Sequence, residues 1–216
     1  MNAPQRLVRS YVRRERPFKE SQKADWGRLW AVYGVEPEGW VQAAAAQPAI
    51  LDIGFGDAEA LLAMAAADPS RRYVGVEMYR TGLLKAMRGA EREGLSNLRV
   101  IEADAKDVLA VLPAGSLAGA HVFFPDPWPK TRHHKRRLVN AAFVGALVRV
   151  LRPGGIIHMA TDWEDYAVEA ADLFGAFALL EPLAQDRKGR PETRFERRGW
   201  RLGHESFDLR YRRREG

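Results

Sequence analysis

Short apolar runs alternate with longer amphipathic stretches from about residue 49 onward. The runs are rich in valine, isoleucine and alanine, and they predict buried strands over residues 49–55, 72–78, 97–104, 119–126 and 155–162. The stretches between and after them predict helices over residues 59–67, 79–93, 136–151 and 163–174, with a short turn or helix at 105–112. Gly94 and the run RPGG (152–155) supply two of the helix stops. Upstream, alanine and aromatic spacing predicts helices over 22–33 and 39–46.

This alternation predicts an α/β fold: a mostly parallel, doubly wound sheet with helices on both faces. The carboxyl ends of parallel strands meet at one edge, where such sheets bind ligands. Each predicted strand ends in or near an acid, and these acids are Asp52, Glu77, Asp104, Asp126 and Asp162. One such acid often only caps the next helix. Five at corresponding positions indicate a crevice lined with carboxylates.

The first strand leads into a glycine-containing turn. Gly54 and Gly56 allow a tight turn and a close approach of the backbone to a ligand. A dinucleotide fingerprint needs a third glycine, where this chain has Glu59, and acidic Asp57 would also repel a pyrophosphate. This argues against a nicotinamide dehydrogenase. A cationic adenosyl ligand without phosphates, S-adenosylmethionine, fits better.

Three of the acids then take distinct places around such a ligand. Asp52 lies at its amino-acid end, and Glu77 is placed to accept hydrogen bonds from the ribose hydroxyls. Asp104 is placed to bond the adenine amine, with a local Asx turn as the equal alternative.

The stretch FFPDPWPKTRHHKRRL (123–138) combines a stiff acid with dense positive charge. Pro125 and Pro127 restrict the backbone around Asp126, which keeps its carboxylate aimed. Trp128 suits stacking on a base or packing as a lid. The cations that would meet phosphates are Lys130, Arg132, Lys135, Arg136 and Arg137.

Composition narrows the function classes. The chain carries 34 Lys and Arg against 28 Asp and Glu, a net charge of +6, and the excess lies near the start, in 130–137 and near the end, which favours a polyanionic partner. We expect a basic, mobile arm over 1–20 and one domain over 21–216 with a basic, RNA-binding C-terminal segment. Zero cysteines exclude a disulfide scaffold, a thiolate nucleophile and Cys-ligated metal, and His133 and His134 lack ligand spacing, so we expect no metal. No apolar run reaches transmembrane length, and we expect a cytoplasmic protein without membrane contact.

The stretch 124–138 closely resembles the motif of the bacterial tRNA (guanine-N7-)-methyltransferase family. The segments LDIGFG, VGVE, EADA, LRPGG, ATDWEDYA and TRFERRGWRLGH stand in the family's order, from about Ala49 to the C-terminus. The resemblance implies a Rossmann-like, class I SAM-dependent methyltransferase fold. It implies S-adenosyl-L-methionine as methyl donor, S-adenosyl-L-homocysteine as product, and guanine 46 in the variable loop of tRNA as target.

The resemblance also implies residue roles. Asp126 corresponds to the catalytic residue, and cofactor-site positions are Asp52, Glu77, Asp104 and Asp126, joined by Gly54 and Gly56 of the turn. Substrate positions are Lys130, Asp162, Thr193, Arg194, Phe195 and Glu196, with the cations of 132–137 facing RNA. Which of Asp126 and Asp162 contacts guanine stays open. The family usually has a glycine where this chain has Ala58, and we expect its methyl group to narrow the pocket slightly.

Two other functions remain as alternatives. One is a methyltransferase that acts on an exocyclic amine of another RNA or DNA base, although its usual Asn/Asp-Pro-Pro-aromatic motif is displaced here to Pro-Asp-Pro-Trp. The other is a non-catalytic RNA-binding protein with a methyltransferase fold. We expect no obligatory protein partner.

Overall fold

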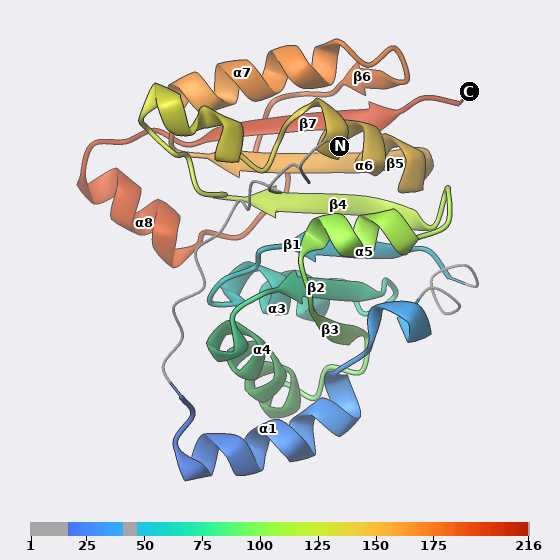
Figure 1. Cartoon of the computed structure of the whole chain (residues 1–216), viewed down its shortest axis with the longest axis vertical. Helices are drawn as coiled ribbons and strands as arrows, with labels where there is room; N and C mark the ends of the chain where they lie inside the picture. The colour runs from blue at the N-terminus through green and yellow to red at the C-terminus, as the bar shows by residue number, and fades with distance from the viewer. Residues whose placement is uncertain (1–16, 41–46, 216) are drawn as a thin grey trace, which may run out of the picture.

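The computed structural model describes residues 17–40 and 47–215, and within them seven strands form one sheet in the order β3-β2-β1-β4-β5-β7-β6 (Figure 1). The strands are β1 (Ala49–Ile53), β2 (Tyr73–Glu77), β3 (Leu98–Glu102), β4 (Leu117–Phe123), β5 (Leu151–Thr161), β6 (Leu180–Pro182) and β7 (Phe207–Arg213). The first five pair in parallel, while β7 runs antiparallel to both β5 and β6. The predicted mostly parallel α/β fold is confirmed.

Helices cover both faces of this sheet. They are α1 (Glu20–Tyr33), α3 (Glu59–Ala67), α4 (Arg80–Arg92), α5 (Ala105–Val111), α6 (Ala141–Val150), α7 (Glu164–Gly175) and α8 (Arg194–Arg201). One buried cluster joins α5, α6 and α7 to the sheet, and a second joins α1, α3 and α4. Successive residues of a strand point to opposite faces, so Leu51 belongs to the first cluster and its neighbour Ile50 to the second. The sheet is therefore doubly wound.

Most predicted elements appear, and the differences in their bounds have local causes. The strand predicted to reach residue 126 ends at Phe123, because Phe124 has a left-handed backbone with φ of 50°. The helix predicted from residue 136 begins at Ala141, where the Asn140 side chain accepts a hydrogen bond from the Phe143 amide at 3.1 Å. Residues 152–155 end α6 as predicted, but they belong to β5, opposite an irregularity in β4.

Two predictions near the N-terminus are tested only in part. The helix over 22–33 is confirmed as α1. The helix over 39–46 is helical at 39–40, and its residues 41–46 lie outside the described residues. Of the arm predicted over 1–20, residues 1–16 also lie outside them, and Glu20 already belongs to α1.

The segment between β4 and α6 is fixed to α7 by Arg137. Its guanidinium donates to the Pro127 carbonyl at 2.9 Å and to Asp165 at 2.7 Å, and it also pairs with Glu169. It lies over the Tyr166 ring, 4.6 Å from the centroid, and only 1% of the side chain is exposed. The prediction that Arg137 faces RNA is therefore wrong, because its donors are used inside the protein.

The basic C-terminal run lies largely within the sheet. β7 separates β5 from β6, and Tyr211 and Arg210 in it are buried, with Arg210 paired to Asp186 at 2.6 Å. The sequence pattern did not predict β6, β7 or α8. No helix in the described ranges has the length and apolar character to cross a membrane.

The Tyr166 hydroxyl allows a test of the packing between α7 and the segment that joins β4 to α6. It accepts a hydrogen bond from the Val139 amide at 3.0 Å, and both residues are fully buried. Tyr166→Phe leaves that amide without a partner, so we expect the free energy of unfolding to fall by about 1–3 kcal/mol in urea denaturation. Tyr211→Phe is the control, because its hydroxyl makes only a 3.4 Å bond to Ala171. Equal losses in both variants would contradict this interpretation.

Candidate functional site

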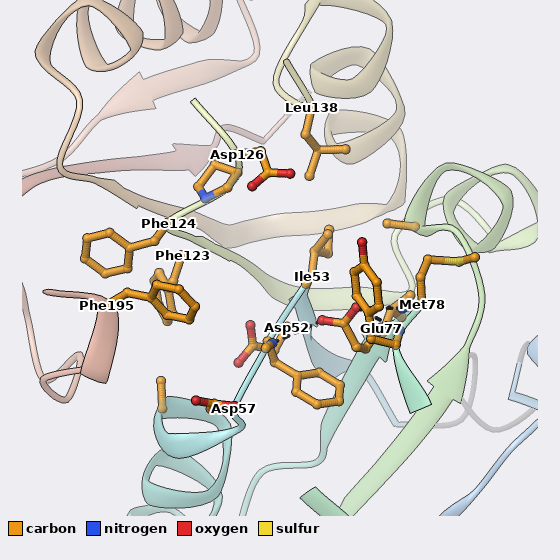
Figure 2. A pocket seen from close by; sticks show the side chains of 18 of the residues that line it. Asp52, Ile53, Asp57, Glu77, Met78, Phe123, Phe124, Asp126, Leu138 and Phe195 are labelled. Carbon is orange, nitrogen blue, oxygen red and sulfur yellow. Dashed lines mark hydrogen bonds between the residues drawn. The ribbon is translucent and has the colours of Figure 1, made fainter. Parts of the chain in front are cut away.

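A pocket of about 340 Å³ lies at the carboxyl ends of β1, β2, β3 and β4. The strand order reverses between β1 and β4, which is the point where open α/β sheets bind ligands. Its volume is within the range of small-molecule sites. Figure 2 shows Phe124 and Phe195 on one side of the pocket and Glu77 and Met78 on the other, with Asp126 at a third position on the wall.

The glycine turn after β1 lines the pocket. Gly54 and Gly56 have φ of 69° and 55°, left-handed values that glycine adopts at little cost. A side chain on Gly82 of α4 would place its Cβ 2.5 Å from the Gly56 carbonyl oxygen. The close approach of helix and turn that a third glycine gives in dinucleotide folds is provided here by Gly82.

Glu77 at the end of β2 holds this turn. One carboxylate oxygen accepts a hydrogen bond from the Gly56 amide at 3.1 Å, and the other accepts from the amides of Met78 at 2.7 Å and Tyr79 at 3.1 Å. Glu77 therefore fixes the glycine turn, and it also lines the pocket. The sequence reasoning missed this role in shaping the turn.

Asp52 is buried at the pocket wall with 1% of its surface exposed. Neither carboxyl oxygen has a hydrogen-bond partner among the described residues. Burial, assisted by the nearby charge of Glu77, raises the pKa of Asp52 to about 7. A buried carboxyl group without a partner, facing a cavity, is suited to a cationic ligand.

Asp104 makes the local turn that was one of its two predicted roles. It is the N-cap of α5, and its Oδ1 accepts a hydrogen bond from the Lys106 amide at 2.9 Å. It also lines the pocket, at the end of β3.

The loop after β4 carries Asp126 to the pocket rim. Phe124 and Trp128, on either side of Pro125-Asp126-Pro127, both have left-handed backbones, with φ of 50° and 45°. Such residues cost about 1–3 kcal/mol each and are held by their surroundings. Asp126 is exposed as a residue, but the pocket wall displaces water from its carboxyl group and raises its pKa, which Arg136 partly opposes.

The start of α8, which is far from the other pocket residues in the sequence, also contributes to the pocket wall. Thr193, Arg194 and Phe195 line it, and 54% of Phe195 remains exposed. Glu59 accepts a hydrogen bond from the Arg194 amide at 2.7 Å and pairs with Arg197 at 3.0 Å. The acid that replaces the third glycine of a dinucleotide motif thus fastens α8 to the glycine turn.

Nine of the predicted site residues line the pocket, and the other seven lie outside its lining. Asp162 does not line the pocket, and its Oδ2 lies 3.2 Å from Nδ1 of His204. Glu196 is fully buried and paired with arginines, and Arg137 is fixed inside the protein. Lys130, Arg132 and Lys135 are exposed beside the Asp126 loop.

Arg136 and Trp128 are in contact within the loop that carries Asp126. Arg136 lies over the Trp128 ring, 4.0 Å from the centroid, so its guanidinium and the indole form one surface.

In the residues that the structure describes, no group of three or more His, Cys, Asp or Glu is placed to hold a metal ion.

Ala58 does not have the effect on the pocket that the sequence suggested. It does not line the pocket, and it is fully buried in the cluster of α1, α3 and α4. Its φ is 65°, a left-handed value, so the position favours glycine because of backbone strain. The expectation that its methyl group narrows the pocket is wrong.

The chain is similar to known methyltransferases over nearly its whole length. The family model Methyltransf_4, described as "Putative methyltransferase", matches residues 46–209. The tRNA (guanine-N(7)-)-methyltransferase of Alkalilimnicola ehrlichii is 46% identical, over 97% of this chain and 94% of the relative. That of Halorhodospira halophila is also 46% identical, over 96% and 95%.

A solved structure shows the same fold at low sequence identity. The 16S rRNA (adenine(1408)-N(1))-methyltransferase of Catenulisporales acidiphilia, solved with its cosubstrate SAM, has a TM-score of 0.53 and 21% identity, covering 84% of this chain and 92% of that chain.

The raised pKa of Asp52 predicts a pH-dependent stability change. The native state keeps a proton on Asp52 that the unfolded chain loses above its ordinary pKa of 3.8, so this group lowers stability as pH rises toward 7. Asp52→Asn removes that cost. We expect the variant to be more stable than the native protein at pH 8 by up to about 4 kcal/mol, from about 1.4 kcal/mol per pKa unit, with little gain at pH 4. Urea denaturation at both pH values measures this, and an equal effect at both would contradict it.

Proposed function

The chain belongs to the tRNA (guanine-N(7)-)-methyltransferase family, and we propose that it transfers the methyl group of S-adenosylmethionine to N7 of guanine 46 in the variable loop of tRNA. One observation carries the proposal: the acid-lined pocket at the β1–β4 crevice opens beside Asp126, with exposed cations next to it.

The residues of the pocket fit S-adenosylmethionine. The carboxyl group of Asp52, which is buried and has no hydrogen-bond partner among the described residues, would accept the ligand's ammonium group. The carboxylate of Glu77, which lines the pocket at the end of β2, would meet the ribose hydroxyls. Asp104 would bond the adenine amine, and the turn at Gly54 and Gly56 would let the backbone approach. The bound sulfonium supplies an activated methyl group.

Methyl transfer to guanine N7 requires little acid–base catalysis by the protein. Guanine N7 has a free lone pair and loses no proton, so the main requirements are alignment and stabilisation of charge. Positive charge develops on the guanine ring as N7 is alkylated. Asp126 would stabilise that charge and accept the base's N1–H, because its carboxylate is held at the pocket rim. Asp162 lies outside the pocket beside His204, so we assign the contact with guanine to Asp126.

The remaining proposed substrate residues divide by exposure. Phe195 offers an exposed ring in the pocket lining, Arg194 lines the pocket beside it, and Thr193 is largely buried in the same wall. Lys130, Arg132, Lys135 and Arg136 would contact the tRNA backbone. We propose residues 21–216 as one catalytic domain on this basis, with no resident metal.

The catalytic role of Asp126 is tested by Asp126→Asn and Asp126→Ala with unmodified tRNA and labelled S-adenosylmethionine. We expect tRNA affinity to stay near that of the native protein and methyl transfer to fall about 100-fold or more. Mass spectrometry of nuclease fragments identifies the product and its position, and tRNA with adenine in place of guanine 46 is the control. Native-like transfer by both variants would remove Asp126 from this role. Methylation on an exocyclic amine would favour the alternative enzyme class, and tRNA binding without any transfer would favour the non-catalytic one.

The exposed cations predict strongly salt-dependent tRNA binding. Each of Arg132→Gln and Lys135→Gln should reduce the slope of log affinity against log salt by about 0.7–0.9, because one phosphate contact is lost. Arg71→Gln is the matched control, since Arg71 precedes β2 at the opposite edge of the sheet. Filter binding across salt concentrations measures the slopes. Identical slopes for all three variants would mean that 132–135 does not face the tRNA.

A further inference from the structure

Arg190 is a buried cation held by two carboxylates, next to two phenylalanines that line the pocket. Its side chain has no exposed surface. It donates to both oxygens of Asp208, at 2.7 and 2.8 Å, and to both oxygens of Glu196, at 2.9 and 2.8 Å. Two bidentate pairs around one planar guanidinium fix its position in every direction.

The partners of Arg190 come from separate parts of the chain. Asp208 belongs to β7 and also lies 2.7 Å from Nε2 of His158 on β5. Glu196 belongs to the first turn of α8 and also accepts from Arg187 at 2.6 Å. Through them, one side chain ties the start of α8 to β7 and its neighbour β5.

The same guanidinium also contacts the end of β4. It lies 5.6 Å from the ring centroid of Phe123 and 5.3 Å from that of Phe124. Phe124 has the left-handed backbone that turns the chain toward Asp126, and its amide donates to the Ala160 carbonyl at 2.7 Å. Arg190 therefore supports the two residues that lead directly into the Asp126 loop.

These contacts join the two pocket walls that would hold the target base. The wall from α8 carries Thr193 and Phe195, within the same turn as Glu196, and the amide of Glu196 donates to the Thr193 hydroxyl at 3.2 Å. The opposite wall carries Phe124 and Asp126. A buried ion pair adds little net stability compared with apolar packing, but its directional bonds fix geometry.

We propose that Arg190 is a positioning residue for methyl transfer, which sets the α8 wall and the Asp126 loop at a fixed separation. Glu196 acts through Arg190 and does not contact the base. The proposal rests on the proposed function, because the separation matters only for a base held between those walls.

Arg190→Lys is the direct test, because lysine keeps the charge but cannot form two bidentate pairs or lie flat on the rings. We expect kcat for N7-methylguanine formation to fall about 10- to 100-fold. The assay is run at a temperature well below the melting temperature of the variant, so that unfolding does not contribute to the loss. The dissociation constants of S-adenosylmethionine and tRNA should stay within about three-fold of the native values, since the loss is one of alignment.

Arg210→Lys is the matched control. Arg210 is also buried and paired, to Asp186 and the Ala184 carbonyl, but it does not contact the pocket walls. It should lower the melting temperature while leaving kcat within about two-fold of native. A purely structural role for Arg190 would give the same result for both variants.

The outcomes separate the two proposals. If the native protein forms no N7-methylguanine, the proposed function fails. If it does and Arg190→Lys has native kcat, only the positioning role fails. Should Arg190→Lys not fold, Asp208→Asn decides, because it weakens one of the two pairs from outside the pocket: a reduced kcat with unchanged dissociation constants supports the role, and a native kcat overturns it.

Discussion

Asp52 carries a carboxyl group that is buried at the carboxyl end of β1 and has no hydrogen-bond partner among the described residues. The surroundings do not relieve this cost, since Glu77 adds negative charge nearby and uses its own oxygens to shape the glycine turn. The parallel sheet imposes the arrangement, because it brings the ends of β1 to β4 to one edge. The pocket is thereby prepared for a cation before any ligand arrives.

Arginines divide between bracing the site and facing solvent. Arg137 and Arg190 are buried, and each holds a segment beside the pocket through two carboxylates from other elements. Arg132 and Arg194 are exposed beside the same loops. The rigid placement of Asp126 and the capacity to attract a polyanion thus come from the same residue type in different environments.

The sequence predicted residues 49–175 of the fold better than the C-terminal residues that follow. Apolar strands such as 72–78 have a pattern that local reasoning can detect, and the acids after them lie where the sheet topology requires. The C-terminal strand β7 carries three arginines and an aspartate among seven residues, so its pattern resembles a solvated segment. Its burial depends on partners such as Arg190 for Asp208, which only the folded chain brings together. Arg137 was misplaced for the same reason, and Ala58 because its strain depends on the backbone conformation.

The central claim is that Asp52 stays partly protonated in the empty pocket and ionises when it receives the ammonium group of S-adenosylmethionine. Calorimetric titration at pH 7 in two buffers with different ionisation enthalpies measures this directly. A pKa near 7 predicts release of about half a proton per ligand bound by the native protein, and almost none by Asp52→Asn. Absence of binding heat, or binding with no difference in proton release between the two proteins, would contradict the claim.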